Sequence, residues 1–367
     1  MSSALTDLSP YPIVQAPMAG GGSRPPLVAA VAQAGGLGFL AAGYKTPEAM
    51  YEEIKQLRGL SDRPFGVNLF MPQPSASATT AVGSEVDLYR EQLTGEATWY
   101  ETPLGDPDAG SDDAYDAKLA ILLDDPVPVV SFTFGCPPRP VLEAFAKAGT
   151  LTVVTVTSPA EAQAAQWSGA AVVCVQGIEA GGHQGTHRDD PKSDGCGSGL
   201  GLLTLVTQVR EAVQLPIIAA GGLMRGGQIA AVLATGASAA QLGTAFLVCP
   251  ESGAHALHKH AMTDPLFTRT ELTRAFSGRP ARGLVNRFMR EHGPYAPSAY
   301  PQVHHLTSGL RKAAAKAGDA QGMALWAGQG HRQARELPAG QLIEVLAAEL
   351  AEARAALAFH PQGESAS

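Results

Sequence analysis

Short apolar runs alternate with helical segments from residue 11 to residue 243, and this rhythm constrains the fold more than any other feature. Ala171–Gln176 is typical, since it has the composition of a buried parallel strand and ends in a glycine-rich loop. Eight such strands with helices between them predict a TIM (β/α)8 barrel. An open doubly wound sheet is the alternative, but it usually has one switch point, whereas glycine-rich breaks follow several strands here. The predicted strands lie at residues 11–16, 37–42, 65–70, 127–134, 150–157, 171–176, 215–220 and 239–243.

Two parts of the chain depart from this rhythm. Residues 72–114, rich in Pro, Ser, Thr, Gly and Asp, predict an excursion loop with one helix over the strand ends. Residues 265–335 contain Pro-rich turns and a helical segment at 306–317, which predict a small, mostly helical lid after the eighth strand. A final amphipathic helix at 341–358 is expected to pack back on the barrel. The expected units are a barrel of residues 1–262 with 338–360, and a lid of residues 263–337.

Charge and cysteine content argue against several classes of protein. The formal net charge is −8 and no basic run is present, which argues against nucleic acid as a partner. The four cysteines form no CxxC pair and the N-terminus lacks a signal-peptide pattern, so a cytoplasmic location is expected. The longest charge-free apolar run, residues 25–44, is broken by glycines, so no membrane span is expected. His187 and Cys196 match no usual zinc spacing, so no metal is expected.

The loop after the sixth predicted strand contains the best reactive candidate. In Gln176–Gly185, glycines surround His183 and let the backbone approach a ligand closely. A titratable histidine just past a strand end lies where α/β proteins carry out chemistry. Its pKa is expected near the working pH, as suits a general base, and an exposed loop histidine is the alternative. His255 and His258 share one face of an expected helix, which we predict to be solvated.

Other strand ends carry residues suited to a ligand with a phosphate and a flat ring. Barrels commonly bind phosphate with the loops after strands seven and eight, and here these loops contain Gly222 and Gly243. Tight turns that need glycine for geometry alone are the alternative. The amides of Asn68 and Gln176 can bond a heterocycle, while Met18 can pack on a ring face or fill the core.

Several short motifs span nearly the whole chain. They are Gln15–Gly20, Gly66–Phe70, Ser131–Gly135, Gln176–Gly185, Ala219–Gly222, Gln241–Thr244, Phe276–Arg282 and Leu325–Gly330. Together they resemble the motifs of the FMN-dependent nitronate monooxygenases, once called 2-nitropropane dioxygenases. Related FMN reductases share the barrel motifs, whereas the residues around Tyr300 and at 325–330 are typical of the monooxygenase branch.

The resemblance implies an FMN cofactor and a catalytic His183 that contacts the substrate. Some members carry a second histidine where this chain has Thr133, which can donate a hydrogen bond but carries no charge, so anion binding is expected to differ. Tyr300 is a further candidate for substrate contact. The implied flavin contacts are Met18, Asn68, Gln176, Gly181, Gly222, Gln241, Leu242, Gly243 and Thr244.

The implied reaction is the oxidation of an alkyl nitronate, of the propionate 3-nitronate type, with dioxygen. The nitronate gives one electron to the flavin, and the substrate radical and flavin semiquinone react with dioxygen to yield an aldehyde or oxo-acid and nitrite. Two alternatives stay open: an NAD(P)H-dependent FMN reductase acting on quinones or enoyl thioesters, and a non-redox phosphate-binding isomerase or aldolase. The expected partners are small molecules, and a homodimer is one expected assembly.

Overall fold

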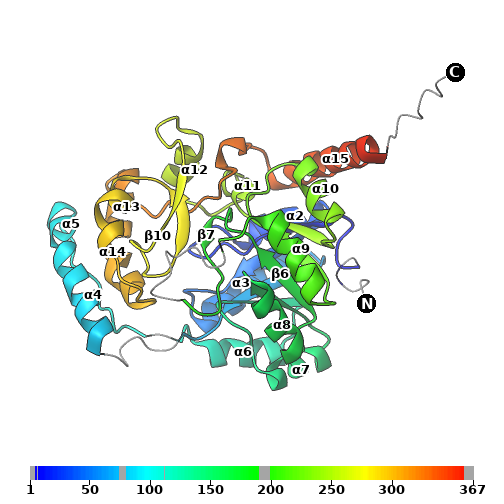
Figure 1. Ribbon diagram of the computed structural model, residues 1–367, viewed down its shortest axis with the longest axis horizontal. Helices are drawn as coiled ribbons and strands as arrows, with labels where there is room; N and C mark the ends of the chain where they lie inside the picture. The colour runs from blue at the N-terminus through cyan, green and yellow to red at the C-terminus, as the bar shows by residue number, and fades with distance from the viewer. Residues whose placement is uncertain (1–4, 6, 74–79, 111, 190–198, 359–367) are drawn as a thin grey trace.

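The computed structural model describes the chain except residues 1–4, 6, 74–79, 111, 190–198 and 359–367, and its centre is a closed barrel of eight parallel strands (Figure 1). Val14 pairs with Gln241, and this pairing of the first strand with the last closes the ring. The predicted TIM barrel is confirmed, and each predicted strand overlaps an observed one. The barrel strands are β1 (Ile13–Gln15), β2 (Leu37–Ala41), β3 (Phe65–Phe70), β4 (Val129–Thr133), β5 (Leu151–Val156), β6 (Val172–Gln176), β8 (Ile217–Ala220) and β9 (Ala239–Leu242).

Capping hydroxyls and prolines set where several of the surrounding helices begin. Thr46 accepts a hydrogen bond from the amide three residues later (3.2 Å), and Ser158 does the same (3.3 Å). Each is followed by a proline, which suits the first helical position because it has no amide to satisfy. The helices around the barrel are α2 (Pro25–Gln33), α3 (Pro47–Leu60), α6 (Tyr115–Asp124), α7 (Arg139–Lys147), α8 (Pro159–Ser168), α9 (Leu202–Ala212), α10 (Gly226–Ala234) and α11 (Thr244–Leu247).

Successive strand residues pack in two different cores, because side chains alternate across a strand. In β4, Val130 packs with helix residues such as Leu142, whereas Val129 packs with Phe39 and Val153 inside the barrel. The barrel interior is therefore a packed core, and space for a ligand is expected only at the ends of the strands.

The C-terminal helix α15 (Ala339–Ala358) contacts α10 and α2 on the outside of the barrel, as predicted. Leu342, Ile343, Leu346 and Leu350 are buried there. No helix among the described residues is long and apolar enough to cross a membrane.

The lid after β9 contains a small sheet that the sequence did not predict. Strands β10 (Thr270–Thr273) and β11 (Ala281–Leu284) are antiparallel, and β7 (Gly182–His183) adds to them from the loop after β6. These strands are short and polar, so they lack the apolar alternation by which a strand is recognised. Helix α12 (Ala256–Thr263) leads into the lid, whose helices are α13 (Arg287–His292) and α14 (Gln302–Lys316), the last of which overlaps the helix predicted at 306–317.

The excursion after β3 differs from its prediction. It contains two helices, α4 (Thr80–Gln92) and α5 (Thr94–Trp99), and they lie beside the lid helices rather than over the strand ends (Figure 1). Tyr89 of α4 is buried, and its hydroxyl donates to Ala275 O (2.7 Å). These helices bury apolar residues against Phe276 and Leu306, which the barrel does not cover. The boundaries of the barrel and lid units stay a prediction.

Candidate active site

A cavity of about 370 Å³ lies where the C-terminal ends of the barrel strands meet the lid. Small-molecule and cofactor pockets commonly measure roughly 300–1,000 Å³. Of the residues predicted to form a site, it brings together Met18, Asn68, Thr133, Gln176, Gly181, His183, Gly222, Gln241, Gly243 and Thr244.

Backbone forms much of the barrel side of this cavity. Gly222 has a φ of +69°, which favours glycine, and a Cβ on Gly181 would lie 2.5 Å from Gly328 N. Gly328 N in turn donates to Thr244 Oγ1 (2.9 Å), so the lid is fastened to the loop after β9. Wall segments this close to one another leave no room for side chains, and they present their peptide groups to a ligand.

Amide side chains complete the barrel side. Asn68 Nδ2 donates to Ser131 Oγ (2.9 Å) and Thr133 Oγ1 (3.0 Å), which fixes the orientation of the Asn68 amide. Gln176 has a structural role that its sequence position did not reveal. Its Oε1 accepts from Gly185 N (2.7 Å) and its Nε2 donates to His183 O (3.1 Å), so it pins the loop that carries the histidine.

Two of the sequence candidates do not line the cavity. Leu242 is buried in the core between the barrel and its helices, because its side chain points to the outer face of β9. Tyr300 lies behind the residues that line the cavity. Its hydroxyl donates to Tyr44 Oη (3.1 Å), and its ring centroid lies 5.8 Å from that of His183.

His183 lies on β7, where the barrel and the lid meet. Its backbone pairs with Ala281 of β11, and its ring packs against the rings of Phe134 and Trp326. Nε2 lies 2.9 Å from Ser277 Oγ, and this hydroxyl donates its proton to Arg279 O (3.1 Å), so it accepts from a protonated Nε2. Ser277 therefore fixes the ring in the neutral tautomer that has its proton on Nε2. Ser277 falls within a motif that the sequence singled out, but no role could be assigned to it there.

The pKa of His183 is lower than the sequence led us to expect. Burial lowers it, and the charges of Arg279 and Arg311 add to that effect, so that it falls to about 3. The imidazole is therefore neutral at working pH. The expected pKa near the working pH was wrong because the ring is packed among the rings of Phe134 and Trp326, with guanidinium charges nearby, and is not on an open loop.

Several further residues at the cavity were given no role by the sequence, although Phe134 and Arg279 fall within quoted motifs. Phe134 adopts a φ of +74°, rare for a non-glycine residue, and its ring stacks on the buried guanidinium of Arg279 at 4.1 Å. Tyr44, His304 and Arg311 line the cavity on the same side. They come from a loop and a helix outside any motif, so only the tertiary fold brings them together.

The helix with His255 and His258 is not simply solvated. Both line the cavity: His255 is exposed and caps α12, whereas His258 is more buried and its Nε2 donates to Trp326 O (3.0 Å). Burial lowers the pKa of His258 to about 4, so this ring is also neutral. The prediction of a solvated face was wrong for His258 because the lid segment at Trp326 covers it.

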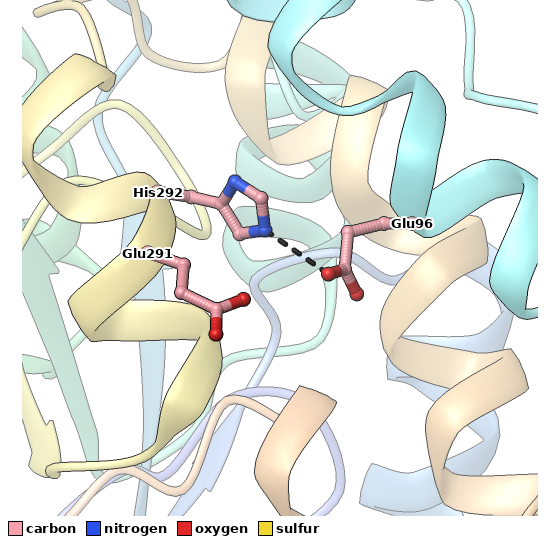
Figure 2. A group of neighbouring side chains, drawn as sticks. All are labelled: Glu96, Glu291 and His292. Carbon is pink, nitrogen blue, oxygen red and sulfur yellow. Dashed lines mark hydrogen bonds and ion pairs between the residues drawn. The ribbon is translucent and has the colours of Figure 1, made fainter.

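Away from the cavity, Glu96, Glu291 and His292 form a group of neighbouring ligand-type side chains (Figure 2). His292 Nε2 lies 3.1 Å from Glu96 Oε1, and Arg287 donates to both carboxylates. Since the guanidinium already supplies the counter-charge, this is an ion-pair network that fastens α5 to α13. His187, the earlier metal candidate, donates to Thr155 O (2.9 Å), and Cys196 lies outside the described residues.

Two solved structures share this fold over nearly the whole chain. The structure of a nitroalkane oxidase from Streptomyces ansochromogenes is 72% identical, covers 97% of this chain and 100% of that one, and has a TM-score of 0.93. FabK from Thermotoga maritima is 28% identical, with 96% and 97% covered and a TM-score of 0.73.

The fold and the site define a class of protein: a TIM-barrel enzyme with a cofactor-sized cavity at the strand ends and a neutral histidine in its wall. The family profile for nitronate monooxygenase matches residues 2–349. The nitronate monooxygenase of Pseudomonas aeruginosa is 41% identical over 351 residues, which cover 92% of this chain and 96% of that protein. The chain belongs to the nitronate monooxygenase family, and it is therefore an enzyme, a flavin-dependent oxidoreductase.

Proposed function

We propose that the flavin is FMN, held at the barrel side of the cavity. The residues suit this group, since close-packed glycine loops present peptide groups and the fixed amides can bond a heterocycle. Gly222, Gly243 and Thr244 would hold the phosphate, while Met18 would lie beside the ring. Asn68, Gln176, Gly181 and Gln241 would contact the flavin with side chain or backbone, and Leu242 only with its backbone.

The enzyme then oxidises alkyl nitronates with dioxygen to an aldehyde or oxo-acid and nitrite. When bound, the flavin supplies the redox chemistry of this reaction. The observation that carries the proposal is the neutral His183 ring, held by Ser277 in the cavity wall. The relatives named nitronate monooxygenase and nitroalkane oxidase support the same choice of substrate.

His183 orients the substrate in this proposal. Because Ser277 Oγ donates its one proton to Arg279 O, it accepts from His183 Nε2–H; the ring then has a bare Nδ1 and positions the nitronate by packing beside it. The buried guanidiniums that lower the histidine pKa favour the bound anion for the same electrostatic reason. The aromatic rings of Phe134 and Trp326 exclude water from around the reacting group.

The proposal is tested by mixing the holoenzyme anaerobically with propionate 3-nitronate, or separately with NADH or NADPH, and following the flavin absorbance. Fast bleaching by the nitronate and none by the nicotinamides is expected. Fast bleaching by NADH alone would overturn it in favour of the NAD(P)H-dependent reductase. A protein that releases no FMN on denaturation would instead indicate a non-redox barrel. Dioxygen as the oxidant, a homodimer and a cytoplasmic location stay predictions.

A further inference from the structure

One side chain with a formal charge lines the cavity. Among the described residues that line the cavity, Arg311 of α14 is the single lysine, arginine, aspartate or glutamate. Its Nη2 donates to His304 O (2.9 Å) and lies 3.3 Å from His304 Nδ1. Nη1 donates to no described residue, and no described carboxylate forms an ion pair with this guanidinium.

The other arginine near His183 differs in this respect. Arg279 does not line the cavity, and its donors are used by Gln184 O (3.3 Å), Gln73 Oε1 (2.9 Å) and the backbone of Thr186. A cation satisfied in this way has a structural role. Arg311 instead keeps a donor free at a place where burial penalises a charge without a partner, so an anionic ligand would compensate it.

The surroundings of Arg311 hold its partner His304 in place. The Tyr44 ring stacks on His304 with centroids 4.1 Å apart, and Tyr44 N donates to Asp113 Oδ1 (2.9 Å). Asp113 forms an ion pair with the buried Lys118 (2.8 Å), so its charge is already compensated. Because His304 Nδ1 accepts from the guanidinium, its proton is on Nε2, which offers a second donor.

His304 and His183 have a common neighbour. The Tyr300 ring lies 5.8 Å from the His183 ring and 6.4 Å from the His304 ring, centroid to centroid. His183, His304 and Arg311 all line the same cavity, so one bound substrate is exposed to all three side chains.

We propose that Arg311, supported by His304, is the specificity-determining residue that binds a second anionic group of the substrate, a carboxylate at the end remote from the nitronate. This inference rests on the proposed function for the reacting end. It predicts that the enzyme discriminates between nitronates of equal length with and without a terminal carboxylate, and that the discrimination depends on Arg311.

The test compares Arg311→Met, Arg311→Lys and a matched control, Lys312→Met, which removes one charge from the exposed side of the same helix. KM and kcat are measured for propionate 3-nitronate and for propyl nitronate, which lacks the carboxylate. In Arg311→Met, KM for propionate 3-nitronate should rise roughly 10- to 100-fold, the size expected for lost charge-assisted hydrogen bonds, with KM for propyl nitronate little changed. In Arg311→Lys, KM for propionate 3-nitronate should rise less than in Arg311→Met, and in Lys312→Met it should not change.

Binding of succinate to the holoenzymes, measured by calorimetry, separates this inference from the proposed function. Succinate should bind the unmodified enzyme and Lys312→Met, and bind Arg311→Met roughly 10- to 100-fold more weakly. If no nitronate is oxidised but succinate binding depends on Arg311, the anion site stands and the proposed function falls. If KM rose equally for both nitronates in Arg311→Met, or if succinate bound this variant as tightly as the unmodified enzyme, the inference would be overturned. Should Arg311→Met fail to fold, the same comparisons on Arg311→Lys decide.

Discussion

The two sides of the cavity are built in different ways. On the barrel side, glycine loops and amides at the strand ends form the wall, as at Gly181 and Asn68. On the lid side, aromatic and charged side chains such as Trp326 and Arg311 form it. A parallel barrel brings its strand ends together whatever the side chains are, so it suits a constant cofactor. The lid places individual side chains, so it suits the recognition of one substrate.

His183 belongs to both sides. Its backbone oxygen accepts from Gln176 of the barrel, while its ring meets Ser277 of the lid. The histidine position is thus fixed by the cofactor side, and its protonation and orientation are fixed by the substrate side. Changes on the barrel side should therefore affect flavin binding, and changes on the lid side should affect substrate turnover with the flavin retained.

The largest effect is expected from Gly181→Ala. A Cβ there would lie 2.5 Å from Gly328 N, and backbone cannot move aside as a flexible side chain can. The loop should shift, the purified protein should contain little flavin, and activity should be lost with it. Flavin content per chain, read from absorbance after denaturation, measures this. Gly227→Ala is the control, because a Cβ at Gly227 meets nothing within 4 Å. Full flavin content in Gly181→Ala would show that this loop does not shape the cofactor site.

His183→Asn should give the next largest effect, on turnover and not on flavin. The asparagine lacks the ring that Ser277 orients, and misplacing a bound substrate by about 1 Å can cost roughly 10²-fold in rate. Nitronate turnover should fall by that order while the flavin content stays unchanged. The exposed His260→Asn serves as the control. Unchanged kinetics in His183→Asn would remove this residue from the mechanism.

The same residue predicts the pH dependence. The folded-state pKa of His183 is about 3, below the ordinary histidine value, so the ring stays neutral in the native protein from pH 8 to pH 5. No titration of kcat/KM from this ring is expected in that range. The unfolded chain does bind a proton there, at about pH 6.5, so stability should fall as pH falls below that value. Thermal unfolding of the native protein and His183→Asn at pH 7.5 and 5.5 checks this: the loss should be smaller in the variant.

The sequence could predict the barrel side far better than the lid side, and the reason is physical. Strand and helix periodicity is local, so the barrel and the positions of Asn68, Gln176 and Gly222 follow from short stretches of sequence. The role of Ser277 depends on the pairing of β7 with β11, between residues that lie far apart in the chain. No local pattern reveals such a contact, and the same holds for Tyr44 stacking on His304.

A smaller effect is expected from Ser277→Ala. The variant removes the partner of His183 Nε2, which lies 2.9 Å away, but keeps the ring itself. One hydrogen bond of this kind contributes about 1 kcal/mol, so kcat should fall roughly 5- to 10-fold with the flavin retained. Ser277→Thr keeps the hydroxyl and should recover part of the loss. If Ser277→Ala lost flavin instead, the division between the two sides of the cavity would be wrong.

The smallest effect on turnover is expected from Glu96→Gln. Glu96 joins α5 to α13 through Arg287 and His292, none of which lines the cavity, and burial opposes its charge unless these partners stay in place. The substitution should lower the free energy of unfolding by about 1–3 kcal/mol, as for lost hydrogen bonds to charged groups, without changing flavin content or kcat. Denaturant unfolding followed by tryptophan fluorescence measures the free energy of unfolding. The flavin and nitronate assays measure flavin content and kcat. Glu85→Gln, on the exposed face of α4, controls for loss of a carboxylate in the same excursion. If kcat fell while stability stayed normal, the excursion would be needed to position the lid for catalysis. Residues that pack on the outer face of the lid would then also influence substrate turnover.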